Sequence, residues 1–276
     1  MEAHLLADSI HIISNRTLSY ISSHIDAERT FTLTATEGLN TSMIPDFEER
    51  TSGKVRDVII CKDIVILITT DRQSAFDRNL QSIPFKGQVL NLLSKWWFTH
   101  SLNMVPNAFL ASSHPNITIA RRCDIFPVEF VIRGYVTGTT ATSMWTNYAN
   151  GVRNYCGHNL PEGLVRNQKL AQNLLTPTTK SSEHDALTSG SEIIASGVMT
   201  AEQYHKCAHY AHTLFAFGQT ECQRRGLILV DTKYEFGLDK VDGTVRLVDE
   251  VHTPDSSRFW MAHSYEQRVA LGLVSV

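Results

Sequence analysis

Hydrophobic and polar residues follow one another along this chain in patterns that predict both strands and helices. Residues 58–61 are apolar, a Lys-Asp pair follows, and Ile64–Ile68 is the longest uninterrupted apolar run. Short runs rich in β-branched residues on both sides of a polar turn are typical of a β-hairpin. We therefore predict two paired strands between Val58 and Thr70.

A segment that starts near Lys86 has apolar residues at the spacing of one helix face, at Val89, Leu92, Leu93, Trp96 and Trp97. Residues three and four apart lie on the same side of an α-helix, so the pattern predicts a helix of about three turns with one buried face. We expect the two tryptophans to pack in the core.

A second helix is predicted from Thr200. The sequence Thr200-Ala201-Glu202-Gln203 has the form of a capping box, in which the hydroxyl of the first residue and the amide of the fourth satisfy free N–H groups. Apolar residues then keep one face as far as Phe215. Arg224, Arg225 and Gly226 supply the cations and the glycine that are common at a helix end.

Three further stretches are expected to be strands: Phe126–Tyr135, a strand from Leu227, and residues 244–251 after a turn at Asp242-Gly243. The Gly, Thr and Ser rich turn at 137–143 is a candidate ligand loop. Residues 154–197 are dominated by turn-forming residues and predict loops with short elements. Residues 1–50 carry no chemical motif, although their apolar residues permit a helix or two.

Composition and charge narrow the class of protein. The 276 residues contain 42% hydrophobic and 19% charged residues, which is ordinary globular usage, and one large domain or two packed lobes is expected at this length. A net charge of −3 and basic residues that occur at most in pairs argue against a nucleic-acid partner. No apolar run approaches the ~20 residues of a membrane helix, and the first residues do not resemble a secretory signal. Five cysteines without a C-x-x-C pair fit a reduced compartment, so we expect a cytoplasmic protein without structural zinc.

The most informative chemical motif is Asp231-Thr232-Lys233-Tyr234-Glu235. Alternate residues of a strand point to the same side, so Asp231, Lys233 and Glu235 are expected to share one face. The acidic pair Asp249-Glu250 ends the next predicted strand and would come close to Glu235. Clustered carboxylates beside a lysine suit magnesium and a phosphate group. An ordinary solvated face of a hairpin is the alternative interpretation.

Two other places carry cations that suit anion binding. In Gly53-Lys54-Val55-Arg56-Asp57 the same alternation puts Lys54 and Arg56 on one face at a strand start, where they could grip phosphates. Arg133 and Arg258 each lie close in sequence to hydroxyl-bearing residues, and arginine's planar fork binds phosphate or carboxylate. A polar edge strand and loop-bridging arginines are the structural alternatives. Neither a P-loop nor a Rossmann glycine motif is present in the sequence.

Taken together, the motifs resemble those of one family, the SAICAR synthetases (phosphoribosylaminoimidazole-succinocarboxamide synthases). The matching stretches occur in family order between about residues 50 and 265: Gly53–Asp57, Thr70–Asp77, Ile83–Gly87, Pro127–Glu129 with Arg133–Tyr135, Thr176–Lys180, Asp231–Gly237 and Asp249–Trp260. A single short motif would be weak, but the ordered series is highly specific.

The resemblance implies an α+β, two-lobed fold related to ATP-grasp enzymes. Residues 51–130 would form an antiparallel, β-rich nucleotide lobe, and residues 131–276 a mixed α/β second lobe with the metal and substrate sites. Residues 1–50 would be an N-terminal extension of unknown role. A monomer or small homo-oligomer is expected.

The resemblance also implies a reaction. ATP, the carboxylated aminoimidazole ribotide CAIR and L-aspartate would give SAICAR, ADP and phosphate, with Mg²⁺ as the metal. A carboxylate is a poor acceptor for an amine, and its phosphorylation to an acyl phosphate provides a leaving group.

Site residues are carried over on the matching positions. The family pattern assigns ATP binding to Lys54, Arg56, Glu129 and Lys233, and Mg²⁺ binding to Glu235 and Asp249. Asp231 and Lys233 would complete the catalytic centre. CAIR binding falls to Arg133, Thr139, Ser257, Arg258, Ser74 and Asp77, and aspartate binding to Lys180, His184 and Asp185. Thr139 stands where many family members have serine, and Thr140, Thr142 and Ser143 keep hydroxyls nearby.

Two alternatives remain at this point. Ala171-Gln172-Asn173 stands where the family usually has Pro-Glu-Pro, so the chain could be a carboxylate–amine ligase that uses another amine. The other alternative is a non-catalytic nucleotide-binding or regulatory protein with the same fold. The intact set of charged motif residues argues against that second alternative.

Overall fold

The computed structural model describes residues 15–28, 32–34, 36, 38–75, 78–179 and 186–272. They form two compact units. Unit 1 consists of the described residues of Met1–His100, Asn107–Asp124 and Asp239–Thr244, and unit 2 of those of Ser101–Pro106, Ile125–Leu238 and Val245–Val276. Helices and antiparallel sheets are mixed in the described chain, which confirms the expected α+β class.

Unit 1 is built on a five-stranded sheet whose spatial order is β1-β2-β3-β7-β6. The strands are β1 (Phe47–Ser52), β2 (Arg56–Cys61), β3 (Ile64–Thr69), β7 (Ile117–Arg121) and β6 (Phe109–His114). Strands β2 and β3 pair antiparallel with Arg56 opposite Thr69, which confirms the predicted hairpin. Alternate residues of both strands are buried, because successive side chains point to opposite faces.

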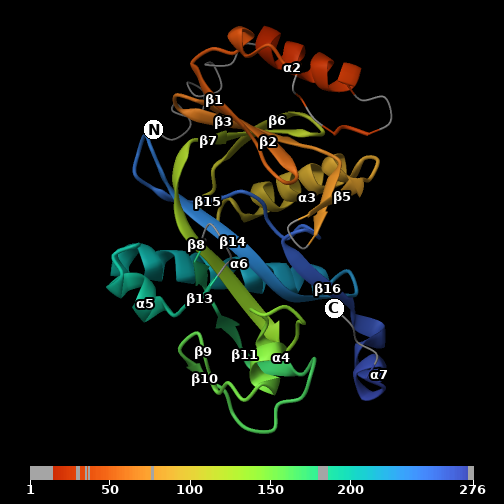
Figure 1. The fold of residues 1–276 in the computed structure, drawn as a ribbon, viewed down its shortest axis with the longest axis vertical. Helices are drawn as coiled ribbons and strands as arrows, with labels where there is room; N and C mark the ends of the chain where they lie inside the picture. Colours follow the sequence, from red (N-terminus) through yellow and green to blue (C-terminus); the bar gives the residue numbers. More distant parts are fainter. Residues whose placement is uncertain are drawn as a thin grey trace. The chain divides into compact units, whose positions relative to one another are not determined.

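Helices cover both faces of this sheet (Figure 1). On one face, Ile21 and Ile25 of α2 (Asn15–Glu28) pack in a core cluster with the sheet residue Ile119. On the other face, Asn91 of α3 (Lys86–Ser101) accepts a 2.8 Å hydrogen bond from Thr118. The predicted helix from Lys86 is confirmed.

The sequence did not predict β1 as part of the sheet. Its burial pattern has no period of two, since only Phe47 and Arg50 are partly buried, and a bulge between Phe47 and Glu49 interrupts its pairing with β2. The expectation that Lys54 lies at the start of a strand is also wrong. The strand begins at Arg56, because Gly53 N donates a 2.7 Å hydrogen bond to Arg56 O and closes a tight turn. A short ribbon, β4 (Arg72–Ala75) with β5 (Arg78–Ser82), completes the strands of unit 1.

Unit 2 is built on a seven-stranded sheet with the order β13-β12-β8-β14-β15, in which β11 also pairs with β8 and β16 with β14. Its strands are β8 (Cys123–Tyr135), β11 (Lys169–Leu175), β12 (Thr178–Thr179), β13 (Ala186–Leu187), β14 (Leu227–Asp239), β15 (Val245–Val248) and β16 (Ser257–Met261). The predicted strands at 126–135, from Leu227 and within 244–251 are confirmed. Strand β16 was not predicted.

Helix α6 (Ala201–Gln223) crosses behind the long strands β8 and β14 (Figure 1). Tyr204 of α6 packs against Phe130 of β8 with 5.6 Å between ring centroids, and Phe130 in turn meets Phe236 of β14 edge to face. The predicted capping box is present: Gln203 N donates to Thr200 Oγ1 and Thr200 N donates to Gln203 Oε1. The cap and the aromatic contacts fix the helix behind the strands that carry the charged motif.

The remaining elements of unit 2 are short. They are α4 (Met144–Ala149), α5 (Gly190–Ala195), α7 (Tyr265–Ala270), the 3₁₀ turn Ala262–Ser264, and the ribbon of β9 (Asn154–Tyr155) with β10 (His158–Asn159). Unit 1 has one further 3₁₀ turn, Thr41–Met43. None of the described helices is long and apolar enough to cross a membrane. All five cysteines lie in the described residues and are free thiols.

Candidate functional site

The charged residues of the candidate site lie on two neighbouring strands of unit 2. Glu129 comes from β8, while Lys233 and Glu235 come from β14. The ammonium group of Lys233 donates to Glu235 Oε1 at 2.7 Å and to Glu129 Oε1 at 3.0 Å. Thr178 of β12 donates to the other oxygen of Glu129 at 3.1 Å. Two residues predicted from the motif thus meet on one face of the sheet, together with a carboxylate from the neighbouring strand.

The carboxylates around Lys233 keep its ammonium group charged. Burial by itself lowers the pKa of Lys233, but the negative charges of Glu235, Asp249 and Glu129 outweigh burial, and the net pKa is raised. The side chain of Lys233 retains 30% exposure, whereas that of Glu235 retains 5%. A protonated ammonium that remains partly accessible is suited to contact an anionic ligand.

Asp249 lies beside this cluster. Glu235 pairs with Val248 across the β14–β15 ladder, so Asp249 is the first residue beyond the partner of Glu235. Its φ of 66° is in the left-handed region, which is uncommon for a residue other than glycine and is often found where function constrains the backbone.

The donor chemistry of Glu235 and Asp249 fits a hard divalent cation. Mg²⁺ takes one or two protein carboxylates and completes its shell with water and phosphate oxygens. Among the described residues there is no group of three or more His, Cys, Asp or Glu side chains that could enclose a metal. Two carboxylates would leave the other coordination positions of Mg²⁺ to water and phosphate oxygens.

Farther along the same face, two arginines share one buried carboxylate. Arg258 of β16 approaches both oxygens of Asp231, with Nε to Oδ1 at 2.7 Å and Nη2 to Oδ2 at 2.6 Å. Arg133 of β8 reaches Asp231 Oδ2 at 3.4 Å and donates to Thr176 Oγ1 at 2.9 Å. The group of two guanidinium ions and one carboxylate has a net positive charge, and this charge favours an anionic ligand.

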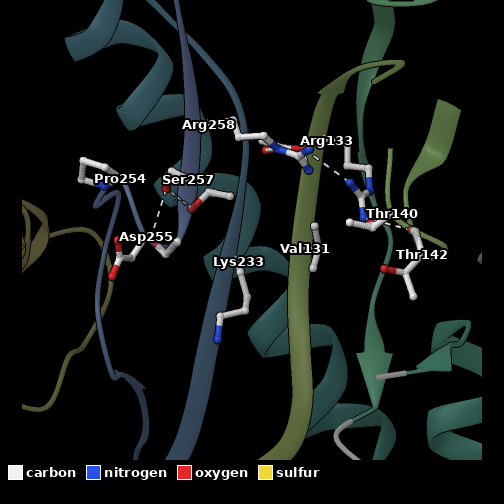
Figure 2. A pocket seen from close by; sticks show the side chains of 12 residues that line it. Val131, Arg133, Thr140, Thr142, Lys233, Pro254, Asp255, Ser257 and Arg258 are labelled. Atoms are coloured by element: carbon white, nitrogen blue, oxygen red, sulfur yellow. Dashed lines mark hydrogen bonds and ion pairs between the residues drawn. The ribbon is translucent and has the colours of Figure 1, made fainter. Parts of the chain in front are cut away.

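A cavity of about 340 Å³ opens over these side chains. Its lining residues are Val131, Arg133, Thr140, Thr142, Asp231, Thr232, Lys233, Pro254, Asp255, Ser256, Ser257 and Arg258. Figure 2 shows Arg133 and Arg258 close together, with Ser257 and Asp255 on one side and Thr140 and Thr142 on the other. The volume is in the range of small-molecule sites. Lys233 lines the cavity and also belongs to the carboxylate cluster, so it links the two parts of the site.

Most of the residues that were predicted to bind CAIR and that lie in unit 2 line this cavity. They are Arg133, Ser257 and Arg258. Thr139 is exposed and does not line it, whereas Thr140 and Thr142 do. Gly138 precedes Thr139 with a φ of 102°. Thr140 and Thr142 follow this left-handed turn and supply hydroxyls to the cavity lining.

Several polar residues around the cavity were not singled out from the sequence. Thr176 holds Arg133, and Thr232 shares a 2.6 Å hydrogen bond with Ser257. Tyr155 donates to the backbone oxygen of Thr142 at 2.6 Å. Thr176 and Thr232 both lie inside the motifs that carried the family resemblance, so the motifs contained a signal for them. Tyr155 lies in a stretch without any motif.

The other predicted site residues lie in unit 1 or outside the described residues. Lys54 is in the turn between β1 and β2, Arg56 begins β2, and Ser74 is in β4. Asp77, Lys180, His184 and Asp185 lie outside the described residues. Their assignments stay predictions.

Comparison with known proteins identifies relatives over most of the chain. The family model for SAICAR synthetase matches residues 49–272. A phosphoribosylaminoimidazole-succinocarboxamide synthase of Legionella pneumophila (strain Lens) is 54% identical over 226 residues, which are 82% of this chain and 72% of that protein. The chloroplastic synthase of Arabidopsis thaliana is 56% identical over 230 residues. That match covers 83% of this chain but only 56% of the plant protein, so the chain spans little more than half of that relative.

Solved structures of SAICAR synthetases also align with most of this chain. The SAICAR synthase from Saccharomyces cerevisiae complexed with SAICAR aligns with a TM-score of 0.69 and 28% identity, covering 82% of this chain and 85% of that one. A type-2 SAICAR synthetase in complex with ADP aligns with a TM-score of 0.66 and 25% identity, covering 82% and 92%. The sequence match, the fold and the ordered motifs agree, and this chain belongs to the SAICAR synthetase family.

Proposed function

We propose that this chain joins L-aspartate to the carboxylate of CAIR in an ATP-dependent reaction that gives SAICAR, ADP and phosphate. The observation that carries the proposal is the cavity in unit 2, where Arg133, Arg258 and Lys233 line one volume beside the carboxylates of Glu129 and Glu235. Family membership supports it, as do relatives whose structures hold SAICAR and ADP.

The arginine pair is suited to hold CAIR. CAIR carries a tetrahedral phosphate and a planar carboxylate. A guanidinium group can bind either anion through two hydrogen bonds. Asp231 orients both forks, since Arg258 contacts its two oxygens and Arg133 approaches one of them. The hydroxyls of Thr140, Thr142 and Ser257 would add neutral hydrogen bonds.

Lys233 is suited to the phosphoryl transfer. The CAIR carboxylate would attack the γ-phosphorus of ATP and form an acyl phosphate, and ADP would leave. Because its pKa is raised, Lys233 would stay protonated and could neutralise phosphoryl oxygens throughout the transfer. The amine of aspartate would then attack the acyl carbon, phosphate would leave, and the amide bond would form.

Glu235 and Asp249 are the residues that would hold Mg²⁺. The ion would offset negative charge on the phosphate oxygens and orient them for transfer. Lys54 and Arg56 of unit 1 would bind ATP phosphates, and Glu129 would contact the nucleotide. The aspartate set Lys180, His184 and Asp185, the CAIR residues Ser74 and Asp77, the cytoplasmic location, and a monomer or small homo-oligomer all stay predictions.

A substrate-omission assay tests the proposal. Purified protein would be incubated with ATP, Mg²⁺, CAIR and L-aspartate, with each component left out in turn, while ADP is measured by a coupled assay and the product by mass spectrometry. We expect SAICAR only in the complete mixture. ADP release that depends on CAIR but needs an amine other than aspartate would indicate a different ligase, and absence of turnover with intact ADP binding would indicate a non-catalytic protein.

A further inference from the structure

Unit 1 contains a buried charged cluster of its own, and none of the residues in this cluster is among those that line the cavity of unit 2. The carboxylate of Asp57 is fully buried and has a guanidinium on each side, with Arg72 Nη2 at 2.8 Å and Arg50 Nη2 at 3.6 Å. Ser52 Oγ donates to Asp57 at 2.6 Å and Thr36 Oγ1 at 2.8 Å. None of these residues was given a role in binding or catalysis.

The Asp57 carboxylate is ionised in this environment. Burial raises its pKa, but the hydrogen bonds from Ser52, Arg72 and Thr36 outweigh burial, and the net pKa lies below the ordinary value. An ionised carboxylate with these partners fixes the plane of the Arg72 guanidinium. The remaining donors of Arg72 are then aimed in defined directions.

Those donors hold the turn between β1 and β2. Arg72 Nη2 donates to Gly53 O at 2.9 Å and Arg72 Nε to Lys54 O at 3.3 Å. Arg72 Nη1 donates to Thr34 O at 2.6 Å. A single side chain thus ties two consecutive carbonyls of the turn to a buried carboxylate and to the segment before β1.

The turn is closed from its other side as well. Gly53 N donates to Arg56 O at 2.7 Å, and a Cβ at Gly53 would lie only 3.1 Å from that oxygen. The backbone N–H and the hydroxyl of Thr70 both donate to Val55 O, at 2.9 and 2.8 Å. Each residue from Gly53 to Arg56 therefore offers its carbonyl to a fixed donor.

We propose that Arg72 is a positioning residue for nucleotide binding: it fixes the Gly53–Arg56 turn so that Lys54 and Arg56 are held ready for phosphate. The proposal rests on the proposed function, in which these two cations contact ATP. A turn that is already ordered loses less conformational entropy when the nucleotide binds. The affinity of the protein for the nucleotide is therefore higher. Lysine cannot replace Arg72, because one ammonium nitrogen cannot reach four acceptors that surround a planar fork.

The test compares Arg72→Lys with Arg50→Lys. Arg50 pairs with the same carboxylate and donates to Thr36 Oγ1 at 2.8 Å, but the hydrogen bonds described for it do not reach the turn. Dissociation constants of ADP and of CAIR would be measured by calorimetry, with melting temperatures as the fold control. We expect Arg72→Lys to weaken ADP about tenfold or more and leave CAIR within about twofold. Arg50→Lys should leave both constants within about twofold.

Lys54→Met is measured in parallel. It distinguishes a failure of the role proposed for Arg72 from a failure of the proposed function. If Lys54→Met binds ADP more weakly and Arg72→Lys binds ADP normally, the role proposed for Arg72 is overturned, while the role of the turn in phosphate binding is not. Unchanged ADP binding in Lys54→Met overturns the assignment of the turn to phosphate. Equal loss of ADP and CAIR affinity in Arg72→Lys also overturns the proposal, since it would indicate a general structural role.

A second variant covers the case in which Arg72→Lys does not fold. Asp57→Asn keeps the shape of the side chain and removes the charge that orients Arg72, and the same two dissociation constants apply. Selective loss of ADP affinity in this variant supports the proposal. Unfolding of both variants overturns it, because Arg72 would then be needed for the fold and not for the turn.

Discussion

Replacement of Arg258 by alanine removes both contacts that its guanidinium makes with Asp231, at 2.7 and 2.6 Å. It also removes one of the two guanidinium groups that line the cavity. The proposed function places CAIR against this group and ATP phosphates against Lys233 and the carboxylate cluster. The substitution should therefore weaken CAIR far more than ATP.

The magnitude follows from the contacts that are lost. A hydrogen bond to a charged group contributes about 1.5–3 kcal/mol, which corresponds to a loss of about 10- to 150-fold in affinity. The variant also leaves Asp231, whose side chain is only 4% exposed, with Arg133 at 3.4 Å as its remaining arginine partner. A buried carboxylate that loses its nearest partner costs about 1–3 kcal/mol of stability. The melting temperature should fall, but the fold should persist.

The assay is steady-state kinetics with CAIR and ATP varied separately, and Arg258→Lys is the matched control. Lysine keeps the positive charge but cannot approach both oxygens of Asp231 as a fork, so an intermediate KM for CAIR is expected. We predict a KM for CAIR raised about 10- to 150-fold in Arg258→Ala and a KM for ATP within about twofold. Equal increases for both substrates would remove Arg258 from the CAIR site and refute the reasoning.

Three other predictions test the site and its support. Lys233→Met should lower kcat about 100-fold or more with the circular dichroism spectrum unchanged, because phosphoryl oxygens lose their cation; near-normal turnover would eliminate the proposed role of Lys233. Gly138→Ala should lower the free energy of unfolding by about 2 kcal/mol or more, measured by chemical denaturation. Gly138 has a φ of 102°, and a Cβ there would lie 2.3 Å from Ser143 Cβ. An unchanged denaturation midpoint would contradict that geometry. Burial lowers the pKa of His252 to about 3, from 6.5, so the unfolded chain takes up a proton before the folded one does. The stability that this neutral histidine contributes is complete above pH 6.5 and is lost as the pH falls toward 3, and His252→Gln should reduce the dependence of the melting temperature on pH between 7 and 5. An identical pH dependence in the variant would contradict this origin.

The sequence was most informative where local periodicity and chemistry coincide. In β14 the alternation of a strand was sufficient to place Lys233 and Glu235 on one face, and the contacts of Lys233 with Glu235 and Glu129 agree with it. The capping box at Thr200 is likewise a local pattern, and it was found as predicted. Both features depend on residues no more than a few positions apart, so no tertiary information was needed.

The features that were missed depend on contacts between distant parts of the chain. Arg72 reaches carbonyls 18 and 19 residues away, and no periodicity marks such a partner. Strand β16 becomes a strand because it pairs with β14, with Asp231 opposite Arg258. Thr139, which the family resemblance assigned to CAIR binding, is exposed and does not line the cavity, whereas Thr140 and Thr142, which also follow the left-handed turn at Gly138, do; the role of Thr139 stays a prediction. For Arg72 and β16, a neighbour that is remote in sequence determines the outcome.

The most direct test of the proposed ligase is to follow the oxygen atoms of CAIR. CAIR labelled with ¹⁸O in its carboxylate would be converted with unlabelled ATP, Mg²⁺ and L-aspartate, and the product and the released phosphate would be examined by mass spectrometry. Formation of an acyl phosphate predicts aspartate-dependent SAICAR and transfer of one labelled oxygen from each carboxylate to phosphate. Absence of SAICAR, or SAICAR formed together with unlabelled phosphate, would contradict the account.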